Sequence, residues 1–115
     1  MNLLNPDLWI NHFPWGNTLA PYFCIAKEEN VSWFPNTILF HNRKEFCQGW
    51  YRDKNWQEQK VTADYSYGMI VSKEQYFHGI YTLVCKLPNF RGSFPAFWFY
   101  DTVPPEKGGI QCEID

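Results

Sequence analysis

Two carboxylates near the end of the sequence are the residues best suited to chemistry. Glu113 and Asp115 flank the apolar Ile114 in the run QCEID. Side chains alternate between the two faces of a β-strand, so both acids point to one side together with Gln111. Two acids on one face of an otherwise apolar strand cost folding energy unless they are solvated or paired. We therefore treat this face as a candidate functional site and expect Cys112 and Ile114 to face a core.

The elements that would position these acids are strands. Aromatic and β-branched runs bounded by turn residues predict strands at 22–27, 37–41, 65–72, 76–87, 94–100 and 110–115. Gly68 interrupts one of them and is expected at a bulge or at a close backbone approach. The polar segment 42–60 is interpreted as a loop with a short strand or one helical turn. Otherwise the first third of the chain is predicted to be an ordered but irregular arm.

These patterns predict an all-β fold in one domain, residues 1–115. About six strands at short spacing, without a convincing helix, indicate a sandwich or barrel. A β-jelly-roll sandwich, of the kind also called concanavalin-like, uses about eight strands. The chain falls short of that number and ends inside a strand, so we expect the incomplete N-terminal part of such a fold.

Composition narrows the classes of function. The net charge of −2 provides no basic field for nucleic acid or an anionic membrane surface. No apolar run approaches the roughly 18 residues of a membrane span, and the first residues do not resemble a signal peptide. Aromatic residues make up 20% of the chain, which fits an all-β core or a sugar-stacking surface. The cell compartment stays open.

Cysteines and histidines give no clear site. The four cysteines, at positions 24, 47, 85 and 112, allow two disulfides in three pairings, and four buried thiols are an equal alternative. No C-x-x-C pair is present and the three histidines are scattered, which argues against a zinc site. Asn30 begins a glycosylation sequon, but such short matches are frequent by chance.

Four segments in order resemble glycoside hydrolase family 16, the β-jelly-roll enzymes that include laminarinases, lichenases, agarases and carrageenases. SYGMIVS is followed by FHGIYTLVCKLP, GSFPAFWF and CEID, so the likeness covers residues 65–115. The matching residues are Gly68, Ile70 and Ser72; Phe77, Gly79, Tyr81, Lys86, Leu87 and Pro88; Gly92, Pro95, Ala96, Phe97 and Trp98; and Glu113, Ile114 and Asp115. The chain departs from the family pattern at His78, Thr82, Val84 and Phe94, and it has Gln111 and Cys112 where a Trp is usual shortly before the nucleophile.

The resemblance implies a retaining endo-glycosidase acting on a β-linked polysaccharide. Glu113 would be the nucleophile, and Asp115 would hydrogen-bond it and tune its charge. Trp98 would stack on a sugar ring, with a plain packing role in the core as an equal alternative. Gln111 would lie beside the acids as a further substrate contact. The acid/base Glu would lie two or three positions beyond Asp115, outside the sequence. No cofactor is expected, although family members can bind a structural calcium ion, and secretion is usual in the family.

Two alternatives remain. A non-catalytic, lectin-like jelly roll would share the architecture without the full set of acids, and a structural β-sandwich could carry EID by accident. For the enzyme, we expect the 115 residues alone to be inactive on laminarin, lichenan, agarose and carrageenan, because general acid catalysis contributes about 10² to 10⁴-fold. Unpaired edges would also make them poorly soluble or dependent on self-association.

Overall fold

A computed structural model describes residues 2–18, 24–76, 78–100 and 113–114. The chain divides into two compact units, Met1–Phe77 and His78–Asp115, called here the N-terminal and C-terminal units. Each is described by itself.

Strands dominate the described residues, and the only helices among them are two short 3₁₀ turns. This confirms the predicted all-β class. None of the described helices is long and apolar enough to span a membrane. In chain order the elements are η1 (Pro6–Leu8), β1 (Trp9–Ile10), β2 (Ile25–Ala26), η2 (Glu28–Asn30), β3 (Val31–Phe34), β4 (Thr37–Phe40), β5 (Arg43–Arg52), β6 (Glu58–Tyr67), β7 (Val71–Ser72), β8 (Phe99–Tyr100) and β9 (Glu113–Ile114).

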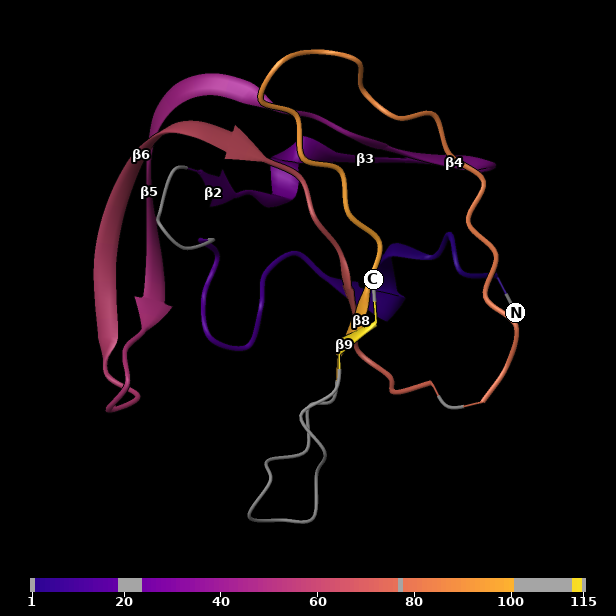
Figure 1. Ribbon diagram of the computed structural model, residues 1–115, viewed down its shortest axis with the longest axis horizontal. Coiled ribbons are helices and arrows are strands. Elements are labelled where there is room, and N and C mark those ends of the chain that lie inside the picture. The colour runs from indigo at the N-terminus through magenta and orange to yellow at the C-terminus, as the bar shows by residue number, and fades with distance from the viewer. Residues whose placement is uncertain (1, 19–23, 77, 101–112, 115) are drawn as a thin grey trace. The chain divides into compact units, whose positions relative to one another are not determined.

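The main element of the N-terminal unit is the long antiparallel hairpin of β5 and β6 (Figure 1). The prediction of a loop over most of 42–60 is therefore wrong. The register shifts between Lys44 and Cys47, where the strand pairing is interrupted by a β-bulge. Beyond the shift, the buried pair Cys47 and Ala63 faces inward, while their neighbours on each strand face solvent.

A carboxylate closes the turn between these two strands. Asp53 Oδ1 accepts hydrogen bonds from the backbone nitrogens of Asn55 and Gln57, each at 2.9 Å. Its second oxygen accepts from Gln59 Nε2 at 2.9 Å. These bonds hold the turn in which Trp56 adopts φ 61°, a left-handed conformation that is unusual for a bulky residue.

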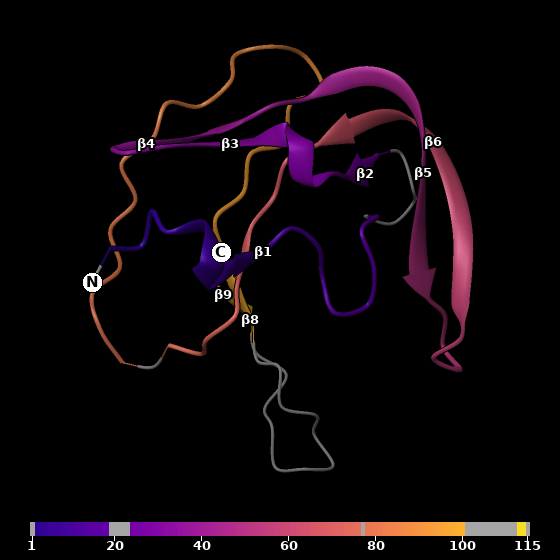
Figure 2. The same ribbon diagram turned by 180° about the vertical axis from the view of Figure 1, so that it is seen from behind.

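The third strand of this sheet is β2, which runs parallel to β6 (Figure 2). The strand predicted at 22–27 is thus present at Ile25–Ala26. The core lies here, where the fully buried Ile25 packs with Cys47, Ala63 and the partly buried Val61. The parallel pairing is a departure from the antiparallel sheets expected of a sandwich.

Two further ladders complete the N-terminal unit. β3 pairs with β4 in the place predicted for the strand at 37–41, and β1 pairs with β7. The predicted strand at 65–72 is present in two parts, because β6 and β7 are separated around Gly68. A Cβ atom at Gly68 would overlap the carbonyl oxygen of Asn30, which confirms the predicted close backbone approach.

The C-terminal unit contains one short antiparallel ladder, β8 with β9. The strand predicted at 76–87 is absent, since residues 78–98 form no strand. Ile80 and Val84 from this segment are 97% and 93% exposed. The segment has the composition of a strand, but none of the strands that the structure describes pairs with its backbone groups, and strand formation requires that pairing. The aromatic strand predicted at 94–100 is correspondingly reduced to Phe99–Tyr100.

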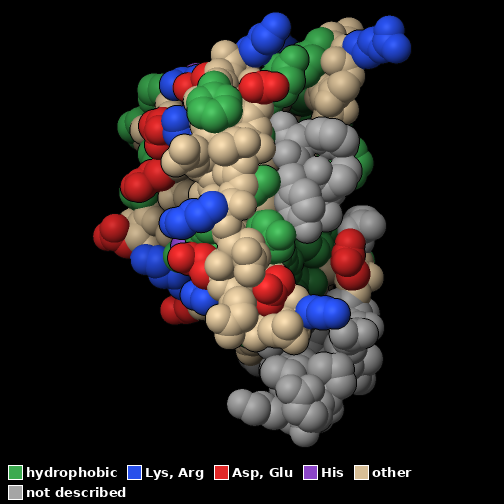
Figure 3. Space-filling model, turned by 90° about the vertical axis from the view of Figure 1, so that its left-hand side faces the viewer, with side chains coloured by type: hydrophobic (Ala, Val, Ile, Leu, Met, Phe, Trp, Pro, Cys, Tyr) green, Lys and Arg blue, Asp and Glu red, His purple; other side chains and the backbone are tan. Residues whose placement is uncertain are grey.

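The outer face of the β5–β6 hairpin carries charged side chains next to the exposed aromatic side chains of Phe46 and Tyr65. Figure 3 shows this side of the structure, with basic and acidic side chains interspersed rather than gathered by sign. Exposed residues of both signs include Arg43, Lys44, Glu58, Lys60 and Asp64. An evenly mixed surface of this kind gives no electrostatic footprint for a polyanion.

Candidate functional site

The β8–β9 ladder places Glu113 beside aromatic side chains. Tyr100 lies directly opposite Glu113, and Phe99 lies opposite Ile114. Residues directly opposite each other in an antiparallel pair project from the same face. Trp98 is two residues before Tyr100, and the two rings are in contact with centroids 5.1 Å apart. Glu113, Tyr100 and Trp98 therefore share one face of the ladder.

The Glu113 side chain is exposed, as predicted for the open face. Within the part of the chain that the structure describes, its carboxylate forms no ion pair and accepts no hydrogen bond. A carboxylate in this setting keeps its acceptor capacity for water or for a ligand.

Trp98 and Tyr100 are both half-buried. Burial raises the pKa of the Tyr100 phenol, so this group stays protonated and remains a hydrogen-bond donor above neutral pH. The face thus combines an exposed acceptor with two partly exposed rings. Such a combination can bind a polyhydroxylated ligand through both its hydroxyl groups and its apolar C–H surfaces.

The opposite face of the ladder is apolar and is partly exposed to solvent. The Phe99 ring contacts Tyr81 at 4.8 Å and Phe97 at 5.3 Å between centroids. Ile114 is on this side, as predicted, but it is 62% exposed, so the expectation that it faces a core is wrong. The reason is that the described residues of this unit form a single two-stranded ladder, which provides no second layer to cover it.

Two predicted site residues, Gln111 and Asp115, lie outside the described residues, as does Cys112, which was expected to face the core. Their expected places beside or behind Glu113 therefore stay predictions. In the described part of the chain, no group of three or more His, Cys, Asp or Glu side chains is arranged to hold a metal ion.

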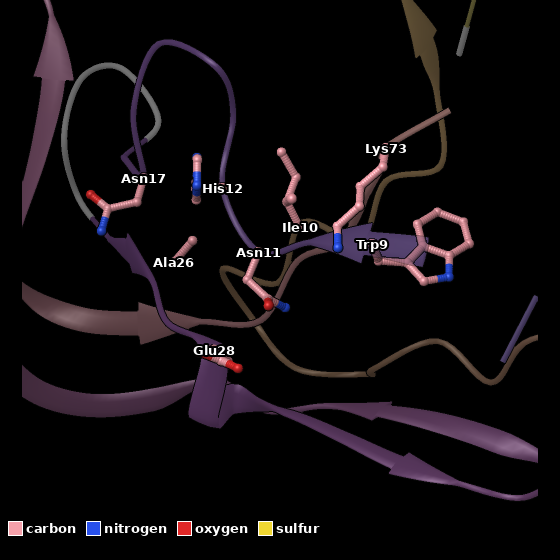
Figure 4. Close-up of a pocket in the computed structure, with 8 residues that line it drawn as sticks. All are labelled: Trp9, Ile10, Asn11, His12, Asn17, Ala26, Glu28 and Lys73. Atoms are coloured by element: carbon pink, nitrogen blue, oxygen red, sulfur yellow. The ribbon is translucent and has the colours of Figure 1, made fainter. Parts of the chain in front are cut away.

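A second polar cluster surrounds a pocket of about 360 Å³ in the N-terminal unit (Figure 4). It is assembled from β1, the loop after it, β2, η2 and the residue after β7. The lining residues are Trp9, Ile10, Asn11, His12, Asn17, Ala26, Glu28 and Lys73.

Hydrogen bonds to the backbone fix three of these side chains. Trp9 Nε1 donates to the carbonyl oxygen of Leu3 at 2.8 Å, and Asn11 Nδ2 donates to that of Met69 at 3.1 Å. Asn17 Oδ1 accepts from the backbone nitrogen of Trp50 at 2.8 Å. The pocket is therefore lined by oriented polar groups.

A buried hydrogen-bond network lies at the junction of η2, β5 and β6. Asn30 Nδ2 donates to Ser66 Oγ at 2.8 Å, and Ser66 Oγ donates to Glu45 Oε1 at 2.5 Å. Lys27 Nζ pairs with the same carboxylate oxygen at 3.1 Å and with Glu29 at 3.0 Å. The hydrogen bond from Ser66, followed by that from Lys27, lowers the pKa of Glu45.

The sequon asparagine belongs to this network. Asn30 is 0% exposed, and its amide nitrogen, the atom that a glycan would require, donates to Ser66. This geometry supports a structural role for Asn30, in line with a chance match to the sequon.

Cys24, Cys47 and Cys85 are free thiols, so no disulfide joins any two of these three. Cys47 is buried, and its Sγ donates to the carbonyl oxygen of Tyr65 at 3.3 Å. Burial raises the pKa of both Cys24 and Cys47, which disfavours the reactive thiolate. Cys85 is exposed.

Sequence analysis missed two features of these sites. Tyr100 could have been found, because it follows Trp98 by two residues and would share its face in any strand. The pocket could not, since its residues come from five separate segments and follow no common spacing.

No protein-family model matches the chain, and no curated protein or solved structure matches it.

Proposed function

We propose that the chain carries the nucleophile strand of a retaining endo-glycosidase of the β-jelly-roll type that acts on a β-linked polysaccharide. The observation that carries the proposal is the register of β8 and β9, which places the Glu113 carboxylate on the same face as Tyr100 and Trp98. The resemblance of residues 65–115 to glycoside hydrolase family 16 supports it independently.

In this mechanism the Glu113 carboxylate attacks the anomeric carbon of the sugar. A bond forms between a carboxylate oxygen and that carbon while the glycosidic bond breaks, and an acid/base carboxyl group protonates the departing oxygen. Water then hydrolyses the glycosyl–enzyme ester and regenerates the carboxylate. In a retaining enzyme the two carboxyl groups lie roughly 5 to 5.5 Å apart, and the resemblance places the second beyond Asp115.

The remaining site residues hold the sugar and the nucleophile. The Trp98 indole offers a flat surface to the C–H groups of a pyranose ring, and Tyr100 places a second ring beside it. By resemblance, Asp115 hydrogen-bonds Glu113 and keeps its orientation, and Gln111 contributes a further polar contact to the substrate.

A substrate that needs no general acid tests the nucleophile directly. Dinitrophenyl 2-deoxy-2-fluoro-β-glycosides of gluco- and galacto-configured disaccharides lose a leaving group that requires no proton. Their fluorine slows hydrolysis, so the glycosyl–enzyme accumulates. We expect one added glycosyl group by intact-mass measurement, located on Glu113 by peptide mapping, and none in Glu113→Gln. Glu58→Gln, which changes an exposed acid of β6, is the matched control.

Labelling at another residue, or none with any disaccharide, would refute the nucleophile assignment. The second candidate function is a lectin-like binder, which the contact between Trp98 and Tyr100 favours because adjacent rings suit sugar stacking. Binding of a β-linked oligosaccharide that is unchanged in Glu113→Gln, lost in Trp98→Ala and accompanied by no labelling would assign the face to binding alone.

A further inference from the structure

We propose that the pocket of the N-terminal unit is a binding site for one neutral sugar residue, separate from the Glu113 face. All residues of this pocket belong to the N-terminal unit, Met1–Phe77, so this proposal does not depend on the proposed function.

Two of the fixed side chains of the pocket, Asn17 and Asn11, keep a hydrogen-bonding group for a ligand. Asn17 uses its Oδ1 for the Trp50 backbone, which leaves both Nδ2 hydrogens as donors. Asn11 uses its Nδ2 for Met69, which leaves Oδ1 as an acceptor. These groups combine donors and acceptors, and a hydroxyl group can satisfy either kind.

The histidine adds a second acceptor. His12 Nδ1 lies 2.7 Å from the carbonyl oxygen of Phe13, which can only accept, so Nδ1 carries the proton. In the neutral imidazole Nε2 then has a free lone pair. The ring lies edge-on to Trp50, with centroids 5.7 Å apart, which restricts its rotation.

The pocket is lined by two side chains of opposite charge that do not form an ion pair with each other. Glu28 and Lys73 both line it, yet neither side chain forms an ion pair or a hydrogen bond with the described residues. Figure 4 shows them on different sides of the Asn11 and Ile10 side chains. A ligand with a single charge would gain from one group and be repelled by the other, so the net field favours a neutral ligand.

The volume of the pocket and its apolar surface narrow the class of ligand further. A volume of about 360 Å³ is near the lower end of the range for small-molecule sites, roughly 300 to 1,000 Å³. Trp9 and Ile10 provide apolar surface, and the bond from Trp9 Nε1 to Leu3 fixes the indole. A hexose residue fits this combination, because it pairs apolar C–H faces with hydroxyl groups that both donate and accept.

The experiment is a titration of the ¹⁵N-labelled chain with glucose, galactose and mannose, followed by two-dimensional NMR. A ligand of about a dozen non-hydrogen atoms is expected to bind in the millimolar range. At least one hexose should shift the side-chain amide signals of Asn17 and Asn11 along a saturating curve. Alanine, a zwitterion that the two opposite charges could also accommodate, is the rival ligand; because it has no hydroxyl groups for the two side-chain amides, it should leave their signals unchanged.

Three variants locate the binding. Asn17→Asp keeps the Oδ1 atom that accepts the hydrogen bond from the Trp50 backbone nitrogen but removes the Nδ2 donor. Glu28→Gln removes the negative charge of the pocket, and Lys73→Met removes the positive charge. In the proposed complex the Asn17 amide, the Glu28 carboxylate and the Lys73 ammonium group each form a hydrogen bond with a hexose hydroxyl group. Each variant should therefore weaken hexose binding about tenfold, as expected for the loss of a hydrogen bond that involves a charged or oriented group. The matched controls, Glu58→Gln and Lys54→Met, alter the β5–β6 hairpin and should leave the affinity unchanged.

Saturable shifts that fall in all three variants would establish the site. The proposal is overturned if no hexose shifts either amide, if alanine binds in preference to the hexoses, or if the three variants bind like the controls. Because Glu113 plays no part in this titration, its failure would leave the nucleophile proposal untouched, and failed labelling of Glu113 would leave the pocket untouched.

Discussion

Gly49→Ala is expected to destabilise the N-terminal unit, because Gly49 lies where β5 crosses the core residue Ile25. A Cβ atom at Gly49 would lie 2.6 Å from Ile25 Cδ1 and 2.6 Å from Asn17 Oδ1. Both distances are well below ordinary contact. The second atom cannot easily move, since it accepts the hydrogen bond from the Trp50 backbone.

Two opposing terms set the magnitude. The backbone of Gly49 is not in the left-handed region, so alanine restricts the unfolded chain and contributes about 0.4–1 kcal/mol of stability. Overpacking costs about 1–3 kcal/mol. The net loss in the free energy of unfolding is therefore about 1–2 kcal/mol.

A double-mutant cycle tests the cause. Ile25→Val removes Cδ1, and alone it should cost about 0.5–1.5 kcal/mol. Combined with Gly49→Ala it removes one of the two clashes, so the double variant should be more stable than the sum predicts by about 0.5–1 kcal/mol. Urea unfolding followed by circular dichroism measures all four proteins.

The control is Gly79→Ala, where the nearest atom to a new Cβ lies 3.8 Å away on the Tyr81 ring. Its effect should stay within about 0.5 kcal/mol. The packing argument fails if Gly49→Ala matches or exceeds the parent in stability, or if its effect and that of Ile25→Val simply add.

Three further outcomes follow from the buried groups. Ser66→Ala should lower the free energy of unfolding by about 1–3 kcal/mol, because the fully buried Asn30 Nδ2 loses its acceptor; urea unfolding measures this, and an unchanged midpoint would contradict it. The folded-state pKa of Glu45 is lowered from 4.5, so its contribution is present above that pH and is lost as the pH falls through the folded pKa. Acid unfolding should therefore be shallower in Ser66→Ala, and parallel curves would refute the coupling. Iodoacetamide should alkylate the exposed Cys85 before the buried Cys47 in the native protein, with peptide mapping as the measurement; equal rates would contradict the burial of Cys47.

The sequence predicted the fold best where one segment carries its own signal. β4 coincides with a compact β-branched and aromatic run, and Gly68 marks a close approach to the Asn30 carbonyl. The β5–β6 hairpin was missed because a bulge interrupts its alternation between Lys44 and Cys47. Its inward positions at Cys47 and Gly49 also hold small residues in place of the large apolar ones that reveal a strand.

The prediction of a strand at 76–87 is wrong although the strand signal in this segment is strong. Ile80 and Val84 have high strand propensity, but propensity describes how well a side chain fits a paired, half-buried surface. Among the described residues of the C-terminal unit no strand pairs with this segment, and both side chains are almost fully exposed. Propensity in one segment cannot specify whether a second segment pairs with it.

The pairing between strands also limits how much of the Glu113 site the sequence could predict. Alternation within one strand predicts that Glu113 and Ile114 occupy opposite sides of it, but both side chains are exposed, so their exposure does not distinguish the two faces. The neighbours of Glu113 depend on the register between β8 and β9, which no pattern within either strand contains. The proposed chemistry depends on that register, because a solvated carboxylate is ordinary on a protein surface. The register sets Glu113 opposite Tyr100 and on the face that holds Trp98, and our proposal of a nucleophilic carboxylate beside a stacked sugar ring rests on this arrangement.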